Sequence, residues 1–184
     1  MRIITTGFDG LLGLVPARFA DDRGWFTESY RKSALAATAI TCEFPQDNLS
    51  WSRKGVLRGL HFQKDPYAQA KLVRVLSGRV LDVVVDIRPS SPTFGKHYRC
   101  ELTAEEGNML FVPEGFAHGF RALEDSLFSY KCSAEYQPAA DSGIRWSDAK
   151  LGIDWGLAAG EIPLVSAKDQ ALPGWEQAFG AFSS

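Results

Sequence analysis

The chain has 184 residues, of which 45% are hydrophobic and 23% are charged, and its formal net charge is -2 at pH 7. This length and composition suit a globular protein, and we expect residues 1–184 to form a single domain. The charge balance provides no general attraction to nucleic acid or to an anionic membrane, and no segment reaches the roughly 20 apolar residues needed to span a bilayer.

The cysteine pattern and the N-terminal segment indicate where the protein works. Cys42, Cys100 and Cys132 are scattered and form no Cys-x-x-Cys pair, which favours reduced thiols over a disulfide framework. The only N-terminal apolar run, residues 11–15, is too short for a signal peptide. We therefore expect a cytoplasmic protein.

Short runs of β-branched and aromatic residues recur along the chain, with turn residues between them. The clearest predicted strands, in chain order, are residues 25–31, 71–76, 79–87, 97–103, 109–112 and 127–133. Helix is expected only over residues 33–39, with Ser33 as N-cap, and in a turn or two between residues 166 and 182. Many short strands with turns between them predict an all-β antiparallel sandwich or barrel.

The turns and one strand carry further predictions. Ser77-Gly78 predicts a tight hairpin between the strands on either side of it. Residues 105–108 predict another turn, and residues 89–95 a longer loop. Residues 80–87 are apolar on both faces except for Asp82 and Asp86, which predicts a central strand.

One stretch has a regular spacing of glycine, proline and histidine. Five residues separate Gly107 from Pro113; Gly115 follows, and two further residues separate it from His118. This is the spacing of the second signature of a cupin barrel.

An earlier stretch matches the first cupin signature but lacks its metal ligands. It contains Gly55, then His61 and Gln63 where a metal-binding cupin has His-x-His, and Lys71 stands at the spacing from Gly78 where the signature has glutamate. Two histidines, an amide and an ammonium form a poor cage for a divalent metal, because a protonated lysine has no lone pair. We expect no metal and no cofactor, and a pocket suited to proton chemistry on an organic anion.

More specific motifs surround these two signatures. They lie, in order, at residues 22–28, 46–50, 55–63, 71–75, 82–95, 113–120 and 166–169. Together they closely resemble the dTDP-4-dehydrorhamnose 3,5-epimerase family of nucleotide-sugar enzymes, over nearly the whole chain from about Phe19 to Asp169. The resemblance implies an all-β cupin-type jelly roll with a few short helices, a homodimer, and catalysis without a metal.

The family's reaction sets clear chemical requirements. The resemblance implies epimerisation at C3 and C5 of dTDP-4-dehydro-6-deoxy-D-glucose to dTDP-4-dehydro-L-rhamnose, a step of dTDP-L-rhamnose biosynthesis. Both carbons flank the C4 carbonyl, so their protons are acidified by the enolate that can form. The reaction needs a base on one face of the sugar, an acid on the other, and a cation at the C4 oxygen.

Four side chains are assigned to these roles. His61 is the candidate base, because an unperturbed imidazole has a pKa of about 6.5. The resemblance implies that Asp169 pairs with His61 and that Tyr130 is the acid on the opposite face. Lys71, which replaces the glutamate of the signature, is expected to stabilise the enolate oxygen. Without the resemblance, Tyr130 would be ordinary strand packing, Lys71 a solvated charge and Asp169 a cap of the tail segment.

The resemblance also implies a set of substrate-binding residues. They are Phe19, Arg23, Phe26, Glu28, Gln46, Asn48, Arg58, His118, Tyr136, Asp141 and Lys168. Arg23, Arg58 and Lys168 are expected near the diphosphate, Gln46 and Asn48 at the phosphates and base, His118 at the sugar or phosphate, and Tyr136 stacked on thymine.

The first four of these residues are expected to reach into the site of a neighbouring subunit, so that the homodimer completes the binding site. Without the resemblance, Phe19 and Phe26 would be core residues and Arg23 would form a surface ion pair with Asp21 or Asp22. The chain departs from the family pattern at Asp141, where glutamate is more common.

Other functions remain open at this point. They are an epimerase acting on one carbon only or on another nucleotide sugar, a ketoisomerase that moves the carbonyl between C3 and C4, a metal-binding cupin, and a non-catalytic sugar-nucleotide sensor. Tyr130 favours the double epimerisation, because the acid at this position in the family serves C5.

Overall fold

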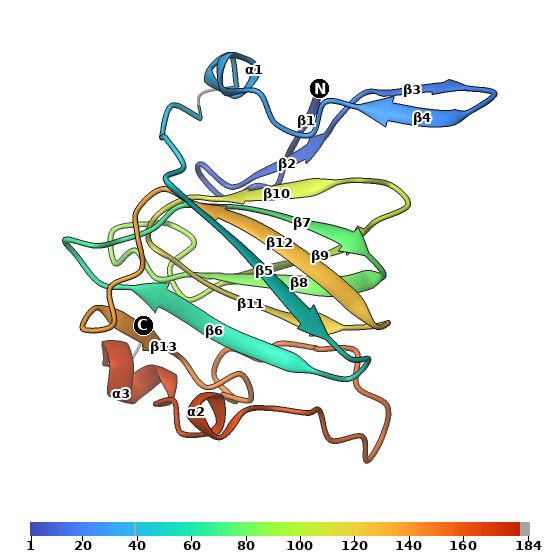
Figure 1. The fold of residues 1–184 in the computed structure, drawn as a ribbon. Helices are drawn as coiled ribbons and strands as arrows, with labels where there is room; N and C mark the ends of the chain where they lie inside the picture. Colours follow the sequence, from blue (N-terminus) through green and yellow to red (C-terminus); the bar gives the residue numbers. More distant parts are fainter. Residues whose placement is uncertain (39, 181–184) are drawn as a thin grey trace.

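The computed structural model describes residues 1–38 and 40–180, which form two antiparallel sheets packed face to face (Figure 1). The six-stranded sheet has the order β1 (Arg2–Thr5), β2 (Leu12–Val15), β10 (Met109–Val112), β7 (Lys71–Ser77), β12 (Ser126–Cys132) and β5 (Gln46–Ser52). The five-stranded sheet has the order β13 (Asp141–Gly143), β6 (Leu57–Gln63), β11 (Phe116–Ala122), β8 (Arg79–Asp86) and β9 (His97–Thr103). The predicted all-β sandwich is confirmed.

The main core lies between the two sheets. It joins residues of β7, β10 and β12 from one sheet to residues of β8, β9 and β11 from the other, among them Val73, Phe128, Val84 and Phe120. Burial of such side chains contributes roughly 1.5–3 kcal/mol each. This packing fixes the distance between the two sheets.

Strand β8 is buried on both faces, as its sequence predicts. Val80 and Val84 belong to the core between the sheets, whereas Val83 and Val85 belong to a second core on the outer face of the five-stranded sheet. The C-terminal segment covers that outer face and contributes Trp155 and Trp175 to the second core, among other residues. Interior strands covered on both sides carry apolar residues on both faces, which explains the composition of this strand apart from Asp82 and Asp86.

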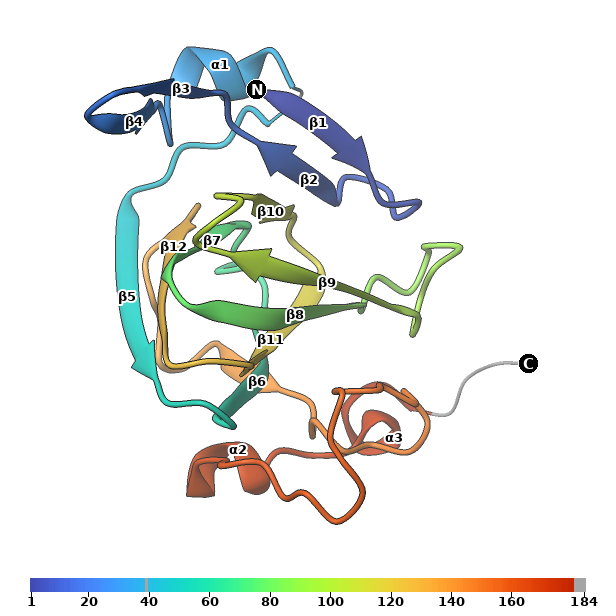
Figure 2. The same ribbon diagram turned by 90° about the vertical axis from the view of Figure 1, so that its right-hand side faces the viewer.

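The short helices lie on opposite sides of the sandwich (Figures 1 and 2). On one side α1 (Lys32–Ala36) begins after Arg31, which caps it without a side-chain hydrogen bond, so the prediction of Ser33 as N-cap is wrong. The expected helix ended at residue 39, which lies outside the described residues. On the other side are α2 (Ala167–Gln170) and α3 (Trp175–Phe179), within the segment predicted to hold a turn or two; its last residues, 181 and 182, also lie outside the described part. The described helices, of four or five residues each, are far too short to span a bilayer.

The Ser77-Gly78 prediction is wrong in a different way. Gly78 does not close a hairpin, because β7 belongs to the six-stranded sheet and β8 to the five-stranded sheet. It is a corner with φ of 81°, and a Cβ at this position would lie 2.2 Å from the carbonyl oxygen of Asp125. The turn at residues 105–108 and the loop at residues 89–95 are present.

A two-stranded arm, β3 (Arg18–Asp21) and β4 (Gly24–Thr27), projects from the sandwich (Figure 1). The strand predicted for residues 25–31 therefore ends earlier, at Thr27. The arm carries exposed aromatic side chains: Phe19, Trp25 and Phe26 are 64%, 56% and 68% exposed. Large apolar side chains clustered on a projecting hairpin are typical of an interaction surface.

Candidate active site

His61 and Asp169 form a hydrogen-bonded pair at the edge of the sandwich. His61 lies on β6, and its Nε2 is 2.8 Å from Oδ1 of Asp169 in α2. The other carboxylate oxygen, Oδ2, accepts a hydrogen bond of 3.0 Å from the backbone N–H of Gly59. The Asp169 residue is only 4% exposed, so its carboxylate is held in a fixed orientation.

The charge state of Asp169 follows from its surroundings. Burial alone would raise its pKa, but the hydrogen bonds from His61 and from the Gly59 N–H outweigh burial and lower the pKa. Asp169 is thus an anion at neutral pH. The α2 helix keeps it in place, because the Asp169 N–H donates to Ser166 Oγ, the helix N-cap, at 3.1 Å.

Close backbone contact positions the strand that carries His61. Gly59 has φ of 112°, and a Cβ there would lie 2.7 Å from Gly119 Cα. A Cβ on Gly119 would in turn lie 2.6 Å from the carbonyl oxygen of Arg58. Only glycine fits at both positions, where the pairing of β6 with β11 is irregular.

Tyr130 comes from the opposite sheet. It lies on β12 of the six-stranded sheet, whereas His61 lies on β6 of the five-stranded sheet, and both line one cavity of about 270 Å³. Burial raises the pKa of the Tyr130 phenol, which keeps it protonated at neutral pH. The imidazole and the phenol therefore enter the cavity from different sheets.

Lys71, the first residue of β7, lines the same cavity. Burial lowers the pKa of its ammonium group, while the nearby Cys132, Asp82 and Asp141 act in the opposite direction. Within residues 1–38 and 40–180, Lys71 Nζ has no hydrogen-bond or ion-pair partner of its own. Its amino group is therefore available to donate to an oxygen of a bound molecule.

A second histidine–aspartate pair lies beside the first. His118 on β11 is the cross-strand partner of His61, and its Nε2 is 2.9 Å from Oδ2 of Asp82 on β8. His118 is 7% exposed and Asp82 is fully buried. Sequence reasoning assigned no role to Asp82 and did not connect it with His118.

Two stacked aromatic side chains form part of the cavity wall. Phe120 on β11 and Phe128 on β12 both line it, and their rings stack with centroids 4.2 Å apart. One ring comes from each sheet, so this contact lies where the two sheets meet. Ser50 and Ser166 also line the cavity, and sequence reasoning did not assign either of them a role.

A second cavity, of about 350 Å³, continues from the first. His61, Lys71, Tyr130 and Lys168 line both cavities, so the two form one cleft. The second cavity is also lined by several residues predicted to bind substrate: Gln46, Asn48, Tyr136 and Asp141.

Several polar contacts organise this part of the cleft. Lys168 Nζ donates to Oδ2 of Asp141, and the Tyr136 hydroxyl donates to the same oxygen at 3.0 Å. Burial would raise the pKa of Asp141, but Lys168 and Tyr136 outweigh this effect and lower it. Arg58 lines the first cavity and is held by Ser52 Oγ and by the carbonyl oxygen of Trp51, each at 3.0 Å.

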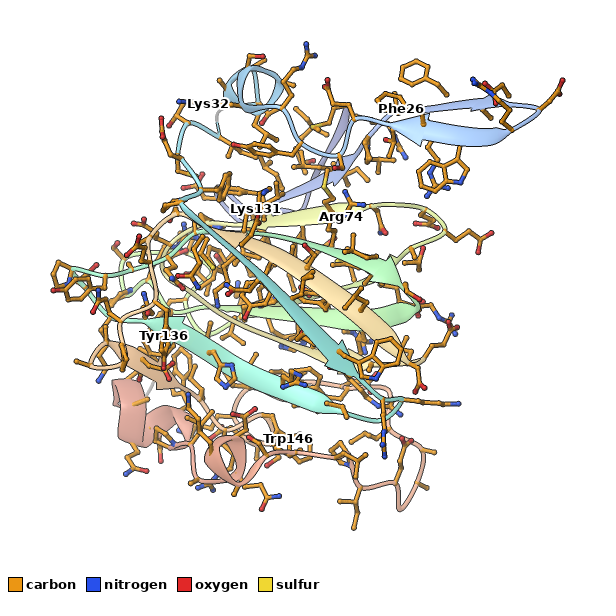
Figure 3. The ribbon with its side chains drawn as sticks, viewed as in Figure 1. Phe26, Lys32, Arg74, Lys131, Tyr136 and Trp146 are labelled. Carbon is orange, nitrogen blue, oxygen red and sulfur yellow. The ribbon has the colours of Figure 1, made fainter. Side chains whose placement is uncertain are left out.

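The remaining predicted residues lie elsewhere in this subunit. Phe19, Arg23 and Phe26 are on the projecting arm and Glu28 follows it, and none of them lines either cavity. Figure 3 shows Phe26 and Tyr136 at well-separated places on the molecule. Arg23 pairs with Asp21 at 2.5 Å, and Glu28 pairs with Arg31 at 2.9 Å.

The cleft's histidines are each bound to one carboxylate. Within the described part of the chain, no group of three or more His, Cys, Asp and Glu side chains is arranged to hold a metal ion. The three cysteines are free.

Comparison with known proteins places these features in a family. A family model described as dTDP-4-dehydrorhamnose 3,5-epimerase matches residues 5–177. The chain is 47% identical over 174 residues to the dTDP-4-dehydrorhamnose 3,5-epimerase of Escherichia coli K12, covering 94% of this chain and 93% of that protein.

Solved structures agree. The structure of dTDP-6-deoxy-D-glucose-3,5-epimerase from Legionella pneumophila, in complex with dTDP-4-keto-L-rhamnose, is 41% identical, has a TM-score of 0.90, and covers 100% of this chain and 99% of that one. A 3'-monoepimerase from Streptomyces bikiniensis, in complex with dTDP-quinovose, is 32% identical with a TM-score of 0.84, covering 95% of this chain and 89% of that one. The predicted cupin-type jelly-roll fold is confirmed, and the chain belongs to the dTDP-4-dehydrorhamnose 3,5-epimerase family.

Proposed function

We propose that this protein is an isomerase that epimerises C3 and C5 of dTDP-4-dehydro-6-deoxy-D-glucose, yielding dTDP-4-dehydro-L-rhamnose. The observation that carries the proposal is the cleft itself. A base paired with a carboxylate enters from one sheet, a phenol enters from the other, and an ammonium group without a partner lies on the same cavity wall. These are the three groups that proton exchange beside a ketone requires.

The first half of each epimerisation is proton removal. In our proposal, the ring nitrogen of His61 that does not face Asp169 takes the proton from the carbon next to the carbonyl. The Asp169 carboxylate holds the other nitrogen as a donor and stabilises the imidazolium that forms. As the proton leaves, negative charge moves to the C4 oxygen.

Lys71 is the proposed partner of that oxygen. Its ammonium group has no competing acceptor among the described residues, and a buried donor of this kind typically contributes about 2.7–4 kcal/mol to transition-state stabilisation. His118, held by Asp82, lines the same cavity and is the proposed contact to the sugar or phosphate. The enolate is thereby held in a polar pocket.

Tyr130 is proposed to return the proton from the opposite face. Its raised pKa keeps the phenol protonated, and its strand lies on the sheet facing that of His61. Removal of the C5 proton from one face and its return by Tyr130 from the other inverts C5. A positioned acid or base contributes roughly 10²–10⁴-fold in rate.

The nucleotide is proposed to occupy the second cavity. Arg58 and Lys168 supply positive charge for the diphosphate, Gln46 and Asn48 supply amide groups, and Tyr136 offers an aromatic face to the thymine. Asp141 orients both Lys168 and Tyr136 in this arrangement.

A second subunit is proposed to complete the site. Phe19, Arg23, Phe26 and Glu28 lie on or beside an arm that projects from its own subunit and exposes its aromatic rings. We propose a homodimer in which each arm enters the cleft of its partner. Mixing a His61→Asn subunit with a Phe26→Ala subunit tests this. If the arms are exchanged, the mixed dimer has one intact site and is more active than either parent. If each site is built by one subunit alone, mixing gives no gain in activity.

The remaining proposals concern context. Residues 1–184 are proposed to form one domain that works in the cytoplasm without a cofactor, with the nucleotide sugar and a second copy of the chain as its partners, and with no binding to nucleic acid or membrane. Full activity after dialysis against a chelator is expected, and activity that requires added metal would contradict this proposal.

The decisive experiment is proton NMR of the reaction in deuterated water. Double epimerisation predicts that deuterium enters both C3 and C5, and His61→Asn should abolish both exchanges. The similarity to a 3'-monoepimerase makes epimerisation at C3 alone the second candidate. Label at C3 with none at C5 would establish that alternative.

A further inference from the structure

Three glutamine side chains hold the backbone of the loop that carries Tyr136. The loop, residues 133–140, connects β12 to β13 and has no regular secondary structure. Gln46 lies at the start of β5, Gln63 at the end of β6, and Gln69 shortly before β7. These three strand ends belong to both sheets and surround the loop.

The contacts form a continuous series along the loop. Gln69 Nε2 donates to the carbonyl oxygen of Ala134 at 2.6 Å. Gln63 Nε2 donates to the carbonyl oxygen of Glu135 at 3.3 Å, and Gln63 Oε1 accepts from the N–H of Gln137 at 2.7 Å.

Gln46 Oε1 accepts from the N–H of Tyr136 itself at 2.7 Å. Each of the four residues 134–137 therefore has one backbone group bound by a glutamine side chain. We name these three side chains, Gln46, Gln63 and Gln69, the glutamine clamp.

The chemistry of the clamp suits this task. A side-chain amide has a donor and an acceptor like a peptide group, so Gln63 bonds the loop much as a neighbouring strand would. Gln63 is 7% exposed, and it also donates to the carbonyl oxygen of Tyr67 at 2.7 Å. Because both the nitrogen and the oxygen of this buried amide are hydrogen-bonded, the Gln63 side chain has little freedom to move, and its bonds restrain the backbone of the loop.

The clamp acts on the aromatic residue at the outer part of the cleft. Tyr136 is 49% exposed, so packing does not hold its ring. Among the described residues, the bond that its side chain makes is from the hydroxyl to Asp141. The direction of the ring is therefore set by the backbone that the clamp fixes, together with the hydrogen bond from its hydroxyl to Asp141. Binding to an ordered ring avoids the entropy of ordering it on association.

We propose that Gln63 and Gln69 are positioning residues for nucleobase recognition: they preorganise the 134–137 backbone so that Tyr136 is ready to stack on the base. This inference rests on the proposed function, in which Tyr136 faces the thymine. Gln63 and Gln69 line the second cavity and not the first, where the catalytic groups meet, so they govern affinity for the nucleotide and not the proton transfers.

The test compares two ligands. Gln63→Met and Gln69→Met remove the clamp hydrogen bonds while keeping the side-chain length, and Gln177→Met, at an exposed position on α3, is the matched control. For both clamp variants the Kd of dTDP should rise about tenfold, whereas the Kd of inorganic pyrophosphate, which has no base, should stay within about twofold. KM for the nucleotide sugar should rise in parallel with the Kd of dTDP, with kcat within about twofold.

A double-mutant cycle shows whether the effect passes through Tyr136. In a Tyr136→Ala background, Gln63→Met should cause no further loss of dTDP affinity. Full additivity would overturn the proposal, as would an equal loss of pyrophosphate binding or an unchanged Kd for dTDP in the clamp variants.

Two further outcomes are distinguishable. If Gln63→Met does not fold, as judged by its thermal unfolding, Gln69→Met at a half-buried position decides the question by the same criteria. If the wild-type protein binds dTDP but exchanges no sugar proton, the proposed reaction fails and the clamp can still hold. If the wild-type protein does not bind dTDP, the proposed role of the clamp in nucleobase recognition is wrong.

Discussion

Replacing Asp169 by asparagine tests the histidine–aspartate pair with almost no change in shape. The Gly59 N–H donates to Oδ2 of Asp169, so in the variant this position must be taken by the amide oxygen. The amide nitrogen then faces His61 Nε2, which lies 2.8 Å away from the equivalent carboxylate oxygen. His61 must accept from this nitrogen and carry its proton on Nδ1.

As a consequence, the lone pair of His61 lies on Nε2, which faces residue 169 and not the substrate. The nitrogen directed at the substrate would be protonated and unable to remove a proton, and the imidazolium would lose its counter-charge. The corresponding aspartate-to-asparagine change in serine proteases lowers kcat by about 10⁴-fold. We expect a loss of about 10³–10⁴-fold here, which is roughly 4–5.5 kcal/mol of transition-state stabilisation.

The assay is kcat for product formation together with deuterium exchange at C3 and C5 measured by NMR. Asp154→Asn, at an exposed residue paired with Arg99, controls for loss of one negative charge and should keep wild-type kcat. Binding of dTDP should be unchanged in Asp169→Asn. If this variant keeps more than a tenth of wild-type kcat, His61 does not depend on Asp169 and the assignment of the base is wrong.

Three other substitutions have distinct expected outcomes. Lys71→Met should lower kcat by about 10²–10³-fold and change the Kd of dTDP much less, and an unchanged kcat would show that another group stabilises the enolate. Tyr130→Phe should lower inversion of C5 by about 10²-fold or more and spare inversion of C3, as read from the products by NMR; equal losses would contradict its role as the acid for C5. For Asp86, burial alone would raise the pKa, but hydrogen bonds from Arg88, Ser91 and Thr93 lower it from 3.8 to about 2. Asp86→Asn should therefore lower the free energy of unfolding by about 2 kcal/mol above pH 4, and this difference should shrink as the pH falls toward 2. Urea unfolding at several pH values measures it. A pH-independent difference would show that the ionised Asp86 carboxylate is not its cause.

Local pattern predicted much of the fold. The run at residues 80–87 indicated an interior strand because both of its faces are apolar, and both faces are indeed buried. Local pattern failed where the outcome depends on distant elements. Ser77-Gly78 has the composition of a hairpin, but whether the chain turns back within one sheet or crosses to the other depends on where β10 and β11 lie.

The same limit applies to the site. His61 and His118 could be found because cupin signatures contain them, and Asp169 could be linked to His61, 108 positions away, only through the resemblance to a family. Asp82 appeared as a charge in an apolar strand and as the first residue of one family motif, with no role assigned to it. Its meaning depends on the pairing of β8 with β11, which brings it to His118.

The stacked rings of Phe120 and Phe128 have an implication for how this enzyme tolerates change. They line the first cavity and pack between the two sheets. Their combined thickness therefore sets the distance between His61 on one sheet and Tyr130 on the other. Replacing either ring by a smaller side chain would let the layers approach and would misalign both chemical groups together. Substitutions at these two positions should therefore change Tm and kcat in the same direction.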